Sequence, residues 1–245
     1  MTNASLISKI EPATRIAVFG FKDSFVGQVF EFLKNLSNYQ IEYFISLYDL
    51  PSLNVEHEHS KRPNRKTEFV VEEKIFGKPV YVDKDYVNRL QNDDINSVLI
   101  LEDDRNIRSE IFKQIKKTNI KILSFIHPSV FFGGFNTLGE GVIIFPNCHI
   151  GYKSDIGDGT ILQSNCLIEH HNSIGSFTDI NPNLTTGGFT KIGDFVEINI
   201  SVVIINRINV NSRSRIGAGS LVLNDCDACT LYYGSPAKAI RRLCD

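Results

Sequence analysis

The sequence of 245 residues predicts two structural parts, a small α/β domain with a parallel sheet over residues 1–123 and a three-sided parallel β-helix over residues 124–245. Two observations lead to this division. In the second half an aliphatic or aromatic residue returns at every sixth position, and in the first half short apolar segments alternate with helical patterns. A period of six fits neither an α-helix nor a two-sided strand, but it fits short strands wound into a triangular prism.

We call the residues at every sixth position ladder residues. They run from Ile126 to Val222 without an insertion or a deletion. Thr186 is the one ladder residue that is neither aliphatic nor aromatic. Gly or Asn often follows the ladder residue, and we expect these positions to form the corners because both residues tolerate turn geometry. Three hexads close one coil, so residues eighteen apart should stack and bury their side chains against neighbouring coils.

The first half predicts alternating strands and helices. Strands are expected over residues 14–20, 41–47, 79–82, 97–102 and 120–125, helices over 23–35, 84–90 and 107–117, and a long polar loop over 48–66. This alternation is typical of a parallel, Rossmann-like sheet, in which ligands bind at the carboxyl ends of the strands. The first of these ends is the turn after residue 19, so the candidate ligand-binding residues there are Gly20, Phe21, Lys22 and Ser24.

The composition argues against several functional classes. The formal net charge is −2, and apolar runs such as residues 97–101 are too short to cross a bilayer, so neither nucleic acid nor a membrane is an expected partner. Residues 1–15 lack the apolar stretch of a secretion signal. Five scattered cysteines with a single CxxC, at Cys226 and Cys229, indicate reduced thiols in a cytoplasmic protein without a metal site.

His170 is the leading candidate for a catalytic residue. It follows the ladder residue Ile168 by two positions, and coil stacking places Tyr152, Gly188 and Asn206 in its column. An imidazole titrates near neutrality and can take a proton from an attacking amine or hydroxyl. Next in the column, the segment 186–188 interrupts the ladder, and the N–H of Gly188 is suited to stabilise the oxyanion of an acyl transfer.

Three segments carry a resemblance to a known family: residues 124–129 (SFIHPS), 168–175 (IEHHNSIG) and 233–238 (YGSPAK). With the hexads, they resemble the hexapeptide-repeat, left-handed β-helix acyltransferases. The similarity is greatest to bacterial sugar acyltransferases that carry an N-terminal α/β domain, which include nucleotide-amino-sugar N-acetyltransferases and relatives of sialic acid O-acetyltransferases.

The resemblance implies a left-handed helix, a homotrimer with active sites between prisms, and a role in bacterial surface-polysaccharide biosynthesis. It implies an acetyl-CoA-dependent N-acetyltransferase that acts on a nucleotide-linked amino sugar, with His170 as general base. The turn at Gly20 would then contact the nucleotide of the sugar. The residues that it implies for contact with coenzyme A are Gly187, Gly188, Asn206, Pro236, Ala237 and Lys238.

The chain departs from the family pattern beside the catalytic histidine. His171 stands where an acidic residue often orients the base. Glu169 is adjacent to His170, but neighbouring strand residues point to opposite faces. Asp179 lies half a coil away and could reach His170 only from another subunit, so the candidates for an orienting residue are His171, Asp179 and Glu169.

Other functions remain open from the residues alone. Transfer to a sugar or sialic acid hydroxyl would use the same residues, and a non-catalytic, nucleotide-sugar-binding solenoid would explain the missing acidic partner. A zinc enzyme of this fold would need three histidines at an interface, and His149 and His170 lack a third. Past the last coil, Lys238, Arg241 and Arg242 either face the phosphates of coenzyme A or form a basic surface helix.

Overall fold

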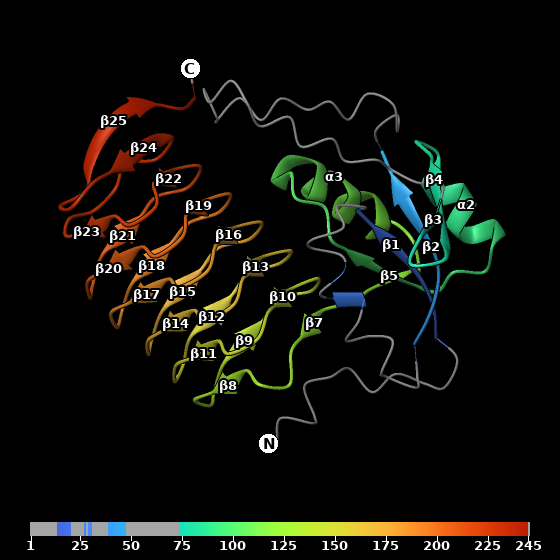
Figure 1. The fold of residues 1–245 in the computed structure, drawn as a ribbon, viewed down its shortest axis with the longest axis horizontal. Helices are drawn as coiled ribbons and strands as arrows, with labels where there is room; N and C mark the ends of the chain where they lie inside the picture. Colours follow the sequence, from blue (N-terminus) through green and yellow to red (C-terminus); the bar gives the residue numbers. More distant parts are fainter. Residues whose placement is uncertain (1–13, 21–26, 28, 31–38, 48–73, 245) are drawn as a thin grey trace. The chain divides into compact units, whose positions relative to one another are not determined.

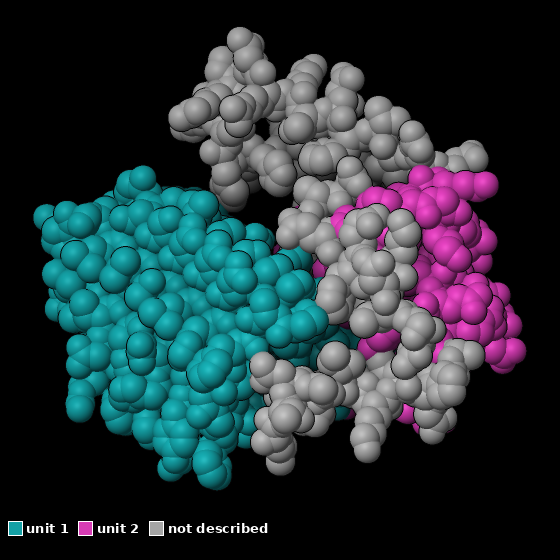
Figure 2. Space-filling view, turned by 60° about the horizontal axis from the view of Figure 1, so that its bottom comes forward, with its two compact units in different colours: residues 1–9, 104–112, 123–245 teal, residues 10–103, 113–122 magenta. Residues whose placement is uncertain are grey.

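The computed structural model describes residues 14–20, 27, 29–30, 39–47 and 74–244. The chain forms two compact units, which are coloured in Figure 2. We call residues 104–112 and 123–245 the prism unit and residues 10–103 and 113–122 the sheet unit. Residues 104–112 thus group with the prism, although the expected boundary at residues 123 and 124 lies beyond them. Within the described ranges, no helix has the length and apolar character that crossing a membrane requires.

The sheet unit contains the expected parallel sheet. Its strand order is β3-β4-β2-β1-β5-β6, and all neighbours are parallel except β3 and β4. The strands are β1 (Thr14–Phe19), β2 (Tyr39–Ser46), β3 (Lys74–Ile75), β4 (Lys78–Val82), β5 (Ser97–Ile100) and β6 (Lys121–Ile122). Helix α2 (Tyr86–Asn92) belongs to this unit, and most of α3 (Arg105–Ile115) belongs to the prism unit. The four residues of β5 are all buried, as expected for a central strand of a parallel sheet.

Parts of the expected first half differ or lie outside the described residues. Of the helix expected over 23–35, residues 27, 29 and 30 are described and helical, and the loop expected over 48–66 is not described. The single strand expected over 120–125 is two short strands in different sheets, β6 and β7. Leu123, which follows β6 in the chain, has a buried side chain.

The prism unit has a two-residue strand at each ladder position, arranged in three parallel sheets (Figure 1). The first face comprises β7 (Phe125–Ile126), β10 (Ile143–Ile144), β13 (Ile161–Leu162), β16 (Asp179–Ile180), β19 (Glu197–Ile198), β22 (Arg215–Ile216), β24 (Thr230–Tyr233) and the antiparallel β25 (Lys238–Arg242). The second face comprises β8 (Phe131–Phe132), β11 (His149–Ile150), β14 (Leu167–Ile168), β17 (Thr185–Thr186), β20 (Val203–Ile204) and β23 (Leu221–Val222). The third face comprises β9 (Thr137–Leu138), β12 (Asp155–Ile156), β15 (Ser173–Ile174), β18 (Lys191–Ile192) and β21 (Asn209–Val210).

Residues eighteen apart stack, as the sequence predicts. Ile144 pairs with Leu162, Leu162 with Ile180, and Ile180 with Ile198, and all four side chains are fully buried. The core is therefore a continuous column of ladder residues along the axis of a left-handed parallel β-helix.

The expected reason for glycine after the ladder residue is wrong. The left-handed backbone conformation occurs two positions later, as at His171 (φ 56°) and Phe189 (φ 62°). Glycine follows the ladder residue because the next coil is too close for a side chain. A Cβ on Gly151 would lie 2.6 Å from the amide nitrogen of His170. Asparagine at this position instead donates to that coil, as Asn181 does to the Ile198 carbonyl at 3.0 Å.

The outer surfaces of the three faces differ in chemistry. On the first face, helix residues 104–112 provide the partners of the charged column that includes Asp179 and Glu197. The third face carries polar outward side chains. The second face has exposed apolar side chains alongside the polar His149 and Thr185: the exposed fractions are 53% at Phe131 and 42% at Val203, and Ile205 beside it is 37% exposed. An apolar strip of this kind is typical of an interaction surface.

The C-terminal segment corrects two expectations. Residues 238–242 form strand β25, antiparallel to β24, and not a helix. This hairpin brings Cys229 and Cys244 together, with Cα atoms 5.3 Å apart, and they form a disulfide. The expectation of reduced thiols is therefore wrong for this pair, because antiparallel pairing of distant segments is not visible in cysteine spacing. Cys148, Cys166 and Cys226 are free and buried.

Candidate functional site

His170 lies at the corner between the second and third faces, between β14 and β15. Backbone hydrogen bonds between successive coils fix the position of each residue along the prism axis. The His171 N–H donates to the Tyr152 carbonyl at 2.8 Å, and the Phe189 N–H donates to the His170 carbonyl at 3.0 Å. Tyr152, His170 and Gly188 therefore occupy equivalent places in successive coils, as expected.

The His170 imidazole lies directly against Gly188. A Cβ on Gly188 would be 2.5 Å from Cε1 and 2.7 Å from Nε2 of His170, and its three nearest atoms all belong to that ring. Glycine is thus required here by the ring itself. No described residue accepts a hydrogen bond from the Gly188 N–H, and Gly188 is half-buried. A potential base and an unused amide donor therefore meet at one corner.

His171 contacts the catalytic candidate through its ring. The two Nδ1 atoms of His170 and His171 are 3.0 Å apart, and the rings are nearly perpendicular at 87°. The Glu169 carboxylate instead accepts a hydrogen bond from the His170 backbone N–H at 3.4 Å. Of the three expected candidates for an orienting residue, only His171 reaches the His170 ring within this chain.

An aromatic row, which sequence reasoning missed, runs along the same corner. Its members are Phe135, Tyr152, His171 and Phe189, with neighbouring centroids between 4.7 and 5.7 Å apart. Phe135 is 80% exposed and Phe189 is 45% exposed. The sequence contains a signal for this row. Phe135, His171 and Phe189 each stand three positions after a ladder residue and are separated from one another by multiples of eighteen positions.

The ladder break at Thr186 has a structural partner. The buried Asn172 side chain donates to the Thr186 hydroxyl at 2.5 Å, and the Glu169 N–H donates to the same oxygen at 3.1 Å. The side-chain oxygen Oδ1 of Asn172 accepts from the Thr190 N–H at 2.6 Å. Hydrogen bonds thus replace the apolar packing that an aliphatic residue would give, and they fix the segment that carries His170 and His171.

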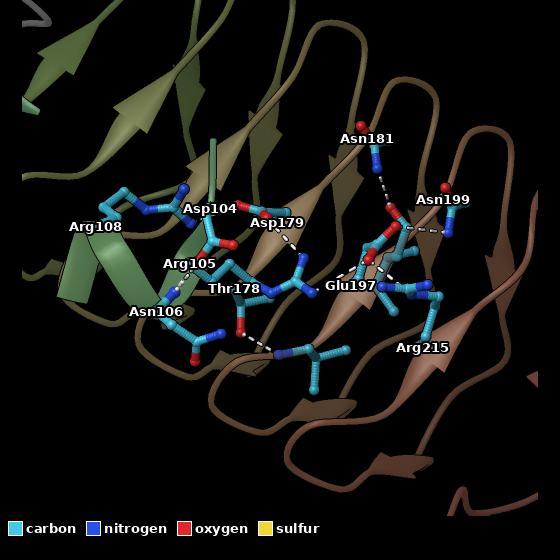
Figure 3. Close-up of polar contacts among 12 residues, drawn as sticks. Asp104, Arg105, Asn106, Arg108, Thr178, Asp179, Asn181, Glu197, Asn199 and Arg215 are labelled. Carbon is cyan, nitrogen blue, oxygen red and sulfur yellow. Dashed lines mark hydrogen bonds and ion pairs between the residues drawn. The ribbon is translucent and has the colours of Figure 1, made fainter. Parts of the chain in front are cut away.

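Asp179 lies on the first face, where Figure 3 shows it beside Arg105 and Arg108. Arg105 Nη1 is 2.8 Å and Arg108 Nη2 is 2.5 Å from its carboxylate oxygens. Arg105 also lies 3.2 Å from Glu197, which forms a second ion pair with Arg215 at 2.8 Å. Burial by itself would lower the pKa of Arg105, but Asp179 and Glu197 outweigh it and raise that pKa. Asp179 therefore holds the helix segment 104–112 on the prism.

The residues expected to contact coenzyme A are spread along the prism. Gly187 and Asn206 lie at the His170 corner, where a Cβ on Gly187 would be 2.7 Å from the Asn206 Cα. Ala237 donates its N–H to the Leu221 carbonyl at 2.8 Å, and Pro236 and Lys238 flank it. Leu221 is in β23, three strands along the second face from β14, which corresponds to about 14 Å along the axis.

The expected ligand-binding turn of the sheet unit is described only at Gly20. Gly20 directly follows β1 with φ 104°, and a Cβ there would lie 2.6 Å from the Leu101 carbonyl oxygen. Phe21, Lys22 and Ser24 lie outside the described residues. Ser46 ends β2 and Glu102 closely follows β5, and both are buried. Sequence reasoning missed this pair, although each is a polar residue at the end of an apolar run.

The described residues include no group of His, Cys, Asp and Glu side chains that could hold a metal ion.

Comparisons with known proteins support the fold. No protein-family model matches the chain. No curated protein sequence matches it either. PerB from Caulobacter crescentus, solved with CoA and GDP-perosamine, superposes with a TM-score of 0.77 at 18% identity, covering 96% of this chain and 100% of PerB. The acetyltransferase domain of PglB from Neisseria gonorrhoeae, solved with acetyl coenzyme A, has a TM-score of 0.75 at 21% identity, covering 93% of this chain and 99% of that domain. The chain therefore shares the fold of these proteins over nearly its whole length.

Proposed function

We propose that this chain transfers the acetyl group of acetyl-CoA to the amine of a nucleotide-linked amino sugar. The observation that carries the proposal is the contact between the His170 ring and Gly188, because it places a base beside a free N–H donor. The similar folds of PerB, solved with CoA and GDP-perosamine, and of the PglB domain, solved with acetyl coenzyme A, support this chemistry.

The proposed reaction needs one base and one oxyanion donor. The sugar amine attacks the thioester carbonyl carbon while His170 Nε2 takes the proton that the nitrogen loses. The Gly188 N–H donates to the carbonyl oxygen as it becomes negative, a contribution worth roughly 3–4 kcal/mol in known oxyanion holes. The carbon–sulfur bond then breaks, the amide forms, and coenzyme A leaves as a thiol after its sulfur takes the proton from the His170 imidazolium.

We assign the remaining expected residues to binding. Gly187 and Asn206 would contact the acyl donor near the reacting carbonyl, and Pro236, Ala237 and Lys238 would contact it further along the second face. In the division proposed here, residues 1–123 bind the nucleotide, with Gly20, Phe21, Lys22 and Ser24 at the first turn. Ser46 ends β2 and Glu102 follows β5, the two strands that flank β1, so both would supply polar groups at the carboxyl ends of these strands.

We further propose that the chain forms a cytoplasmic homotrimer that functions in surface-polysaccharide synthesis. Support for self-association comes from the second face, where Phe131, Val203 and Ile205 are exposed. Burying such a strip against a second copy would remove apolar surface from water at about 25 cal/mol per Å². The His170 corner borders this face, so the neighbouring prism would complete the acyl-donor groove.

The test is the release of free thiol from acetyl-CoA in the presence of GDP-, UDP- and dTDP-linked amino sugars. We expect turnover with at least one of them, and a kcat about 10²- to 10⁴-fold lower for His170→Ala. His127→Ala is the control, because that imidazole contacts Ser129 near the first coil and should be dispensable. Equal rates for His170→Ala and the parent would contradict the assignment of the base. Turnover only with hydroxyl analogues of the sugars would favour O-acetylation.

A further inference from the structure

The 3.0 Å contact between Nδ1 of His170 and Nδ1 of His171 allows only one of the two atoms to carry a proton. A hydrogen bond between two imidazole nitrogens needs one proton, so one Nδ1 donates and the other accepts. Nδ1 of His170 faces His171 at 3.0 Å, whereas Cε1 and Nε2 face Gly188. If His170 donates, its Nε2 is left unprotonated toward Gly188. In the opposite arrangement Nε2 of a neutral His170 carries the proton and cannot act as a base.

The structure fixes the His171 ring firmly. Its backbone is in the left-handed conformation, and its ring stacks on Phe189 with centroids 4.7 Å apart and an interplanar angle of 12°. The Tyr152 ring packs edge-on against it at 5.7 Å. The next residue, Asn172, is anchored in the core through Thr186. The position of Nδ1 of His171 is therefore set by packing on both sides.

No described carboxylate competes for Nδ1 of His170. Glu169 binds a backbone N–H, and Asp179 is engaged by two arginines on the first face. The charged side chains that pack on the aromatic row are Lys153, 5.2 Å from the Tyr152 ring centroid, and Arg207, 5.2 Å from that of Phe189. Both are positive, and the Glu169 carboxylate is directed to the backbone N–H, so the partner of the His170 ring at this corner is the His171 imidazole and not a carboxylate.

From this geometry we propose that His171 is the positioning residue of the base. Its unprotonated Nδ1 accepts the Nδ1–H of His170, which holds His170 in the tautomer whose Nε2 can take the substrate proton. When Nε2 takes that proton, His170 keeps its Nδ1–H and the hydrogen bond persists in the imidazolium. The inference rests on the proposed function, because it assigns how the same base is oriented without a carboxylate.

The test compares His171→Phe with His171→Asp. His171→Phe keeps a ring to stack on Phe189 but removes the acceptor, and the prism already holds phenylalanine at this backbone conformation at Phe177, Phe189 and Phe195. We expect kcat to fall about 10- to 100-fold with little change in the KM for acetyl-CoA. His171→Asp restores an acceptor, so its kcat should recover. A negative charge favours the imidazolium, so the acidic limb of its kcat/KM profile should move to higher pH.

Nitrogen-15 NMR of histidine-labelled protein reads the tautomer without any turnover. We expect His170, assigned by its loss in His170→Ala, to carry its proton on Nδ1 in the parent and on Nε2 in His171→Phe. His171→Gly, which suits a left-handed backbone and has no side-chain acceptor, repeats the measurement if the phenylalanine variant is unstable. A parent His170 protonated on Nε2, or a His171→Phe variant with parental kcat, would overturn the proposal. Absence of thiol release with every acceptor, with the expected tautomer present, would instead count against the proposed function alone.

Discussion

Replacing Gly188 by alanine should remove activity without harming the fold. Carbon atoms make van der Waals contact at about 3.5–4.0 Å, and the new Cβ would lie 2.5 Å from Cε1 of His170. The imidazole must therefore move by about 1 Å. Displacements of this size can cost about 10²-fold in rate, which corresponds to about 2.7 kcal/mol of activation free energy. The backbone N–H of residue 188 remains, so the loss would come from the base.

Gly187→Ala provides the matched control, because the neighbouring glycine contacts backbone. A Cβ there would lie 2.7 Å from the Cα of Asn206, so the coil itself must shift. We expect this variant to lose about 1–3 kcal/mol of stability and several degrees in Tm. Gly188→Ala should keep the parental Tm, since its three nearest atoms belong to a movable side chain.

Thiol release at saturating acetyl-CoA and acceptor, with thermal melts of both variants, separates the two effects. A folded Gly188→Ala protein with kcat within about twofold of the parent would refute the reasoning, because a ring displaced by 1 Å could not serve equally well. Loss of stability in Gly188→Ala as large as in Gly187→Ala would show that the His170 ring cannot move aside.

Two further predictions concern stability and thiol chemistry. Asp179→Ala removes the carboxylate that pairs with Arg108, whose side chain is 1% exposed. The free energy of unfolding in urea should fall by about 3 kcal/mol, with a smaller loss for Asp179→Asn. Parental stability of the alanine variant would contradict the ion-pair reasoning. In the native protein at pH 8 no thiol should react rapidly with a disulfide reagent, because all three free cysteines are buried. At Cys226, burial and neighbouring carboxylates also raise the pKa to about 12, so its thiolate is scarce. Denaturation alone should expose three thiols and denaturation with reductant five, whereas five without reductant would show that Cys229 and Cys244 are not bonded.

The repeat was predictable because its cause is local and periodic. Each ladder residue packs its side chain at the axis of the prism. The pattern from Ile126 to Val222 therefore determines the strands, the stacking of residues eighteen apart, and the column that contains His170. The role of glycine after the ladder residue was misread, since the obstacle at Gly151 is the backbone of the next coil. That obstacle exists only once the coils are stacked.

The sequence by itself determined the prism, its coil height and the pairing of His170 with Gly188, because periodic burial leaves one arrangement of the ladder. Only the tertiary structure decided which partner each polar group finds. Asp179 faces Arg105 and Arg108, Thr186 accepts from Asn172, and Nδ1 of His171 meets that of His170. These contacts depend on side-chain directions and on segments distant along the chain, such as the helix on the first face, and a six-residue period carries no information about either.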